Sequence, residues 1–221
     1  NYTFDAKMPV AGKKVAIVKE LVEKADDATR AKVAAFAEKL RANGVVVEEI
    51  SLDIFEVANT TWQILMTAET CNNVSRYDGV KFGYRAKEYK NIDELYVNSR
   101  TEGFNFLTKA VILYGSDVLS KNRYDACYGK ALKVRRVVAE RIAEVLSQYD
   151  AILTPACGKD AYQSYEMKDA FVKVFGESVY TAVANLIGIP ALVSGGVELM
   201  GKQFSESVLL SLAGSTERIG E

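Results

Sequence analysis

The side chains that could support nucleophilic chemistry in this sequence are few. The chain contains 3 cysteines and no histidine, which excludes Ser-His-Asp and Cys-His catalysis and zinc bound through histidine. Cys71, Cys127 and Cys157 are too widely spaced for a CxxC metal motif, and free cysteines are mostly buried apolar residues. Only Cys157 follows an apolar run and a proline, where a strand would end in a loop. Its thiol would need a lysine or a helix terminus to become a nucleophile.

Two glycine-containing segments are the other candidates. Ser194-Gly195-Gly196 could present backbone amides to an anion, but it lacks the Lys-Ser/Thr of a phosphate loop, and a tight turn is the favoured interpretation. The segment 75–85 is rich in aromatic and charged side chains. This composition fits either a binding loop or a structural turn. In the structural turn, Asp78-Gly79 makes the bend and Arg76 pairs with a carboxylate.

The elements that would position these residues begin with a strand, a helix and a strand. The apolar run 14–18 predicts a buried strand. Asp26 or Asp27 can cap a helix that Asn43-Gly44 ends, and residues 45–50 predict the second strand. This order favours parallel neighbours joined by a right-handed crossover.

The rest of the chain alternates helices with short strands. Further helices are predicted at 55–75, 91–100, 106–119, 124–147, 171–187 and 205–212, and further strands at 151–153 and 190–193. The predicted fold class is α/β, a mixed β-sheet covered by helices.

Composition and charge narrow the function classes. Hydrophobic residues (49%) and charged residues (26%) are at the levels of an ordinary globular domain. The net charge of -1 argues against nucleic-acid wrapping, so the basic face of the predicted helix 124–147 is interpreted as solvated. No apolar run approaches the roughly 18 residues of a membrane span, and no signal-peptide pattern opens the sequence, which favours the cytoplasm.

Several segments stand out in order along the chain: 12–20, 68–79 with 83–85, 100–104, 124–126, 130–135, 149–155 and 184–190. Together they strongly resemble the amidase signature family and, within it, the A subunits of glutamyl-tRNA(Gln) amidotransferases. The resemblance covers nearly the whole chain. It implies that residues 1–221 form a single α/β unit, the C-terminal part of a larger amidase-type domain.

The resemblance also implies where catalysis takes place. The family uses a lysine and two serines, one of them in a Gly/Ser-rich stretch, and nothing in this sequence matches that set. We therefore expect no catalytic residue in this chain, and no metal or cofactor. The segment 194–197 is shorter than the family's usual hairpin, so either the loop is trimmed or residues are missing there.

The resemblance also assigns substrate-contacting positions of the family to residues of this sequence, and some of these residues differ in type from those of the family. The substrate-binding candidates are Trp62, Val111 and Ser178, and the cleft-lining candidates are Arg76, Tyr77, Asp78 and Cys157. Val111 stands where the glutamine-using subunits have an arginine, and Ser178, next to Glu177, stands where they have an aspartate. Losing a bidentate arginine removes a contact of about 1.5–3 kcal/mol, which puts glutamine as the nitrogen donor in doubt.

The resemblance implies a parent enzyme that hydrolyses a small amide. If it is a true A subunit, it passes ammonia to a partner that amidates Glu-tRNA, with subunits B and C as partners, tRNA contacted only indirectly and no membrane contact. Two alternatives stay open: a stand-alone amidase for another small amide, which Val111 and Ser178 favour, and a non-catalytic binding or assembly domain. Apolar surface left by a missing half would also allow the fragment to self-associate.

Overall fold

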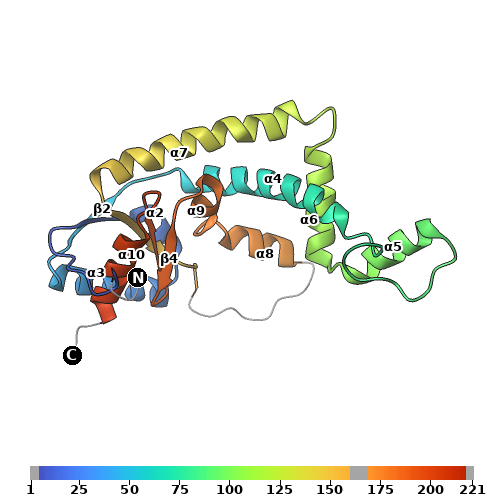
Figure 1. The fold of residues 1–221 in the computed structure, drawn as a ribbon. Coiled ribbons are helices and arrows are strands. Elements are labelled where there is room, and N and C mark those ends of the chain that lie inside the picture. Colours follow the sequence, from blue (N-terminus) through green and yellow to red (C-terminus); the bar gives the residue numbers. More distant parts are fainter. Residues whose placement is uncertain (1–4, 160–168, 218–221) are drawn as a thin grey trace. The chain divides into compact units, whose positions relative to one another are not determined.

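The structure, a computed structural model, describes residues 5–159 and 169–217. Figure 1 shows the helices and strands in chain order. They are β1 (Lys14–Val18), α2 (Lys19–Lys24), α3 (Asp27–Ala42), β2 (Val46–Ile50), α4 (Phe55–Asn73), η1 (Val74–Arg76), α5 (Ile92–Gly103), α6 (Phe106–Val118), η2 (Asp125–Gly129), α7 (Lys130–Gln148), β3 (Ala151–Pro155), α8 (Ala170–Glu177), α9 (Ala182–Ile187), β4 (Ala191–Ser194), β5 (Val197–Gly201) and α10 (Glu206–Glu217).

The chain groups into two compact units. The first consists of Asn1–Thr60, Val134–Ser164 and Phe175–Glu221, and the second of Thr61–Lys133 and Tyr165–Val174. All strands of the described residues belong to the first unit. The first unit contains the sheet, and the described part of the second is helical. That residues 1–221 form a single α/β unit stays a prediction.

The first unit is built on a mixed sheet. Its strand order is β2-β1-β3-β5-β4. β1 pairs in parallel with β2 and β3, whereas β5 pairs antiparallel with β3 and β4. The parallel β1–β2 pair on either side of α3 confirms the predicted strand-helix-strand unit, and the α/β fold class is confirmed.

One face of this sheet forms a core with α3 and α10 (Figure 1). Leu153 of β3 and Leu199 of β5 are fully buried, and they belong to the same cluster as Leu40 of α3 and Leu212 of α10. Successive strand residues point to opposite faces, yet neighbours such as Met200 are also fully buried. Both faces of the central strands are therefore covered, as is usual for sheets with parallel strands.

Local signals set the ends of α3. The Asp26 carboxylate accepts a hydrogen bond from the Thr29 amide at 2.8 Å, which identifies Asp26 as the N-cap. At the other end Asn43 is the C-cap and Gly44 follows with φ 78°. Both termini therefore lie where the sequence predicted them.

Two helical predictions need correction. The predicted helix 124–147 starts as a π-helical turn, because the Gly129 amide bonds to the Tyr124 carbonyl, five residues back, at 2.9 Å. The predicted helix 171–187 is two helices, α8 and α9. The chain turns at Ser178, between the two helices. Tyr180, in the same connection, is buried, with 2% of its surface exposed.

The sequence prediction missed β5. All its residues are buried, and it lies between β3 and β4 in the sheet. Gly195 and Gly196, with φ of 61° and 85°, form the two-residue connection from β4. The tight-turn interpretation of Ser194-Gly195-Gly196 is thus confirmed, with a strand on each side.

The described part of the second unit is helical. α5 begins at Asn91, whose side chain accepts a hydrogen bond from the Glu94 amide at 2.9 Å, as predicted. α4 and α6 approach closely at Gly115. A Cβ atom on Gly115 would lie 2.1 Å from the Thr67 carbonyl oxygen, so only glycine fits at this crossing.

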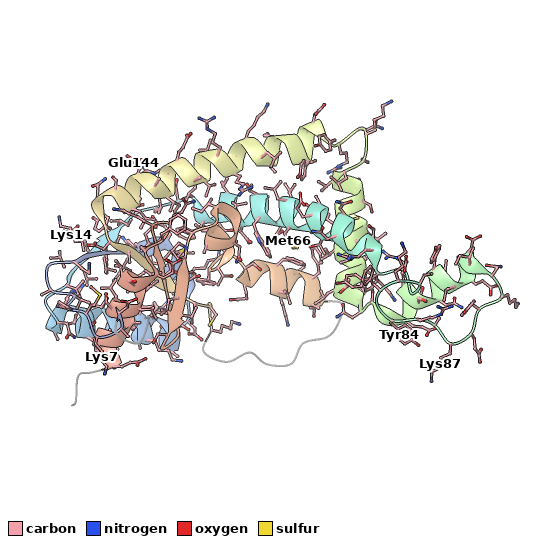
Figure 2. The ribbon with its side chains drawn as sticks, viewed as in Figure 1. Lys7, Lys14, Met66, Tyr84, Lys87 and Glu144 are labelled. Carbon is pink, nitrogen blue, oxygen red and sulfur yellow. The ribbon has the colours of Figure 1, made fainter. Side chains whose placement is uncertain are left out.

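The exposed face of α7 carries charges that pair along the helix. Arg136 and Glu140 form an ion pair with a distance of 2.8 Å, and Arg141 pairs with Glu144, which is labelled in Figure 2. Such pairs are typical of a solvated face and support that interpretation. Of the helices in the described ranges, none is both long and apolar enough to cross a bilayer.

Candidate functional site

The residues predicted to contact or line a substrate cleft fall into both compact units. Those of the second unit are Trp62, Arg76, Tyr77, Asp78 and Val111, and those of the first unit are Cys157 and Ser178.

In the first unit, polar groups converge where β3 ends. The Gly158 amide donates a hydrogen bond to Glu177 Oε2 at 2.9 Å, and the Gly158 carbonyl accepts one from the Asp26 amide at 2.8 Å. The Tyr180 hydroxyl lies 2.9 Å from the position that a Cβ of residue 158 would take. We call Asp26, Cys157, Gly158, Glu177 and Tyr180 the β3-end cluster. It joins the loop after β3 to the end of α8.

Burial raises the pKa of the Tyr180 hydroxyl. Desolvation, with the nearby Glu177 carboxylate as the next cause, raises the Tyr180 pKa to about 12. The phenol is protonated at neutral pH, as an ordinary tyrosine also is. The Asp26 pKa is lowered by hydrogen bonds from Thr29, so the N-cap carboxylate stays ionised. The cluster can position polar groups, but its tyrosine is not a base at neutral pH.

The two predicted residues of this unit lie near the cluster or in it. The Cys157 thiol donates a hydrogen bond to the Lys159 carbonyl at 3.0 Å. The Ser178 carbonyl accepts hydrogen bonds from the amides of Thr181 at 3.1 Å and Ala182 at 2.8 Å, which form the turn into α9. Because Gly158 bonds to Glu177, the structure brings Cys157 close to the chain that carries Ser178.

In the second unit, the segment 75–85 is a structured turn. Asp78 accepts hydrogen bonds from the amides of Val80 at 2.8 Å and Lys81 at 3.1 Å, which lower the Asp78 pKa. Gly79 has φ 80°, and a Cβ there would lie 2.4 Å from Ser99 Oγ. Asp78-Gly79 therefore makes the bend, as the turn interpretation predicted.

Arg76 does not form the carboxylate pair that the turn interpretation included. Its guanidinium lies over the Phe82 ring, 4.4 Å from the ring centroid, and it forms no ion pair with a carboxylate of residues 5–159 or 169–217. An exposed arginine and an exposed phenylalanine gain a cation–π contact without desolvating a carboxylate. The Tyr77 ring is also exposed, at 44%. A binding role for Arg76 and Tyr77 stays a prediction.

Arg100 holds this turn to α5. Its guanidinium donates hydrogen bonds to the carbonyls of Val74 and Tyr77, each at 3.1 Å. Tyr84, labelled in Figure 2, donates to Glu102 at 2.7 Å, and this hydrogen bond raises the Tyr84 pKa. The α5 residues thus act as the support of the turn.

The other two candidates of the second unit belong to its helices. Trp62 is half-buried on α4, and Val111 is buried on α6. An apolar, buried Val111 offers no charged contact to a carboxylate.

The sequence predicts no function for Glu177, Tyr180 or Arg100. Glu177 stands out there only as the neighbour of Ser178, and Arg100 only within the segment 100–104. Their contacts join segments that are far apart in sequence, so no local pattern indicates them. Across the described residues, no group of three or more Cys, Asp or Glu side chains could hold a metal ion.

Comparison with protein families and known relatives identifies the fold. The Amidase family model matches residues 1–210. The A subunit of the glutamyl-tRNA(Gln) amidotransferase of Clostridium botulinum (strain Loch Maree / Type A3) is 34% identical over 228 residues, covering 99% of this chain and 47% of the relative. That of Fusobacterium nucleatum is also 34% identical, with the same coverage.

Solved structures of amidase-signature proteins also resemble this chain in fold. The A subunit of the Thermotoga maritima glutamyl-tRNA(Gln) amidotransferase has a TM-score of 0.62 and 26% identity, over 95% of this chain and 43% of that chain. A bacterial aryl acylamidase of the amidase signature family has a TM-score of 0.71 at 15% identity, over 99% of this chain and 46% of that chain, which shows the shared fold. The chain spans about half the length of the curated relatives it matches. On the family match over residues 1–210, this chain belongs to the amidase signature family.

Proposed function

We propose that residues 1–221 are the C-terminal portion of an amidase-signature amidohydrolase most like the A subunit of glutamyl-tRNA(Gln) amidotransferase. The observation that carries this proposal is the match along 99% of this chain to only 47% of an A-subunit relative. The catalytic lysine and serines of the family find no counterpart in the sequence. We infer that they belong to the unmatched part of the fold, and that this chain is not catalytic by itself.

In this proposal each unit supplies its own candidate residues to the substrate cleft. The substrate-binding candidates are Ser178 in the first unit and Trp62 and Val111 in the second, and the cleft-lining candidates are Cys157 in the first and Arg76, Tyr77 and Asp78 in the second. The parent enzyme would release ammonia from a small amide for amidation of Glu-tRNA, acting in the cytoplasm with subunits B and C.

A second function has a specific observation in its favour. Val111 is buried and apolar, and Ser178 is a neutral side chain, so neither supplies a charge to the ends of glutamine. A charged contact contributes about 1.5–3 kcal/mol, so a neutral pair favours a substrate without the carboxylate and the amino group. The parent enzyme would then be a stand-alone amidase for another small amide.

A chimera tests the proposal and separates the two functions. In the Clostridium botulinum A subunit, the matched region is replaced by residues 1–221, and ammonia release is measured with glutamine and with small neutral amides. We expect the chimera to release ammonia, because it combines a catalytic part with related cleft residues. The A subunit without the replacement is the control.

The outcome assigns the substrate. Glutamine hydrolysis stimulated by subunits B and C supports the amidotransferase function, whereas a preference for neutral amides that ignores those subunits supports the stand-alone amidase. A folded chimera that hydrolyses neither would contradict the proposal and would favour a non-catalytic assembly domain.

A further inference from the structure

Phe204 combines two unfavourable features. Its φ is 62°, and it is the one non-glycine residue with positive φ in the described part of the chain. Its side chain is 94% exposed. A bulky residue in the left-handed region is strained, and an exposed phenyl group gains nothing from water.

The local turn explains the backbone but not the side chain. Phe204 lies between β5 and α10, where the Ser205 amide and hydroxyl both donate to the Lys202 carbonyl, at 3.1 and 2.7 Å. This tight connection requires a left-handed residue, for which glycine or asparagine is suited. The described contacts within the chain therefore give no reason for a phenylalanine at this position.

An open apolar groove begins at the two residues before Phe204. It has a volume of about 650 Å³, and its polar residues include Lys202 and Gln203. Ile142 and Leu146 of α7 line it together with Ile187 and Ile189 at the end of α9, all in the first unit. The Phe204 ring, being 94% exposed, does not fill this groove.

From the groove residue Ile189 the chain runs directly into the strand at one edge of the sheet. The Gly201 amide, next to Lys202, donates to the Pro190 carbonyl at 3.1 Å, directly before β4. β4 is the last strand of the sheet order. The side chain of its Val193 is 60% exposed. Proteins normally cover such an edge, because its free amides and carbonyls pair readily with another strand.

The length of the relatives indicates what covers this surface. The chain corresponds to 47% of the Clostridium botulinum relative and to 46% of the aryl acylamidase, so more than half of an amidase is additional polypeptide. Interfaces of this kind are anchored by a few aromatic residues beside apolar pockets. We propose that Phe204 and the groove from Ile142 to Lys202 bind the remaining part of the amidase fold. This inference rests on the proposed function and adds to it the residue that anchors the two parts.

Separate polypeptides test the inference. The full 221-residue chain is mixed with the part of the Clostridium botulinum A subunit that lies outside the matched region, and binding is measured by calorimetry and by light scattering after size exclusion. We expect a one-to-one complex, and Phe204→Asn is expected to weaken it by at least about tenfold. Leu113→Ala, which removes a 72% exposed side chain of α6, is the matched control and should leave the affinity unchanged.

The same variant is also expected to change the stability of the isolated chain, in the direction opposite to its effect on binding. Asparagine tolerates positive φ, so Phe204→Asn should raise the unfolding midpoint of the isolated chain while it weakens binding. Loss of binding with a lower midpoint would indicate a merely structural role and would overturn the inference.

The outcomes separate this inference from the proposed function. An active chimera whose separate parts do not bind, or whose separate parts bind equally well with Phe204→Asn, would overturn the inference and leave the function. A homodimer of the wild-type chain that Phe204→Asn converts to a monomer would overturn it too, by assigning the surface to a second copy. An inactive chimera together with no binding would overturn both.

Discussion

Replacing Gly115 with alanine is expected to lower the free energy of unfolding of the second unit by at least about 3 kcal/mol, the upper end of what overpacking costs. The new Cβ would lie 2.1 Å from the Thr67 carbonyl oxygen and 2.7 Å from Cys71 Cβ, both on α4. The carbonyl belongs to a helix backbone and cannot rotate away, so α4 and α6 must separate. Urea unfolding of the full chain, followed by circular dichroism, measures the effect.

Gly176→Ala is the matched control. Gly176 also lies in a helix, α8, but a Cβ placed on it would have no heavy atom within 4 Å, and its φ is not positive. Alanine is the better helix former by about 1 kcal/mol, so this variant should be neutral or slightly stabilising. Equal stability of Gly115→Ala and the wild type would show that α4 and α6 do not meet as described.

Glu198→Gln is expected to stabilise the chain by about 3 kcal/mol at pH 8 and by much less at pH 5. The Glu198 side chain is 3% exposed, and its Oε2 atom has no hydrogen-bond partner among the described residues. Burial raises the Glu198 pKa to about 7 from an ordinary value of 4.5. The difference of about 2.5 pKa units corresponds to about 3 kcal/mol.

The raised pKa determines the direction of the pH dependence. The folded chain binds the Glu198 proton more tightly than the unfolded chain, so this group destabilises the fold as the pH rises above 4.5, and the effect levels off above 7. Glutamine carries no charge and abolishes this dependence. Urea unfolding at pH 5 and pH 8 measures it.

Glu38→Gln, at an exposed carboxylate of α3, is the control and should change stability by less than about 0.5 kcal/mol at either pH. If Glu198→Gln and the wild type lose stability in parallel between pH 5 and pH 8, the buried carboxyl is not the titrating group.

The first part of the sheet could be predicted from sequence because its signals are local. Asp26 caps α3 and Gly44 follows its end, so the helix boundaries depend on single residues. The parallel pairing of β1 and β2 then follows because a helix as long as α3 carries the chain back to the starting end of the sheet.

β5 could not be predicted because it is defined by its contact with β3, a strand that is distant in sequence, and not by a local pattern. It is short, it lies between two strands and buries both faces, and it contains Glu198, a residue that exposed strands would carry. The break between α8 and α9 has a similar cause. Burial of Tyr180 beside Gly158 depends on the loop after β3, which is distant in sequence.

The candidate site divides in the same way. The bend at Asp78-Gly79 follows from residue type, and it is present. The Arg76 guanidinium contacts the Phe82 ring instead of a carboxylate. Next to Cys157, the Gly158 amide donates a hydrogen bond to the Glu177 carboxylate. Residue types indicated where polar groups gather, whereas the pairs among them depend on how distant segments pack.

Ammonia release by the purified 221-residue chain is the most direct test of the central claim, that this amidase-family chain is a portion without its own catalytic set. The chain is supplied with glutamine and with a series of small amides, and ammonia is measured against a control without protein. We predict no release above that control, because the lysine and serines of the family have no counterpart here. Sustained release that scales with the concentration of the chain would contradict the claim.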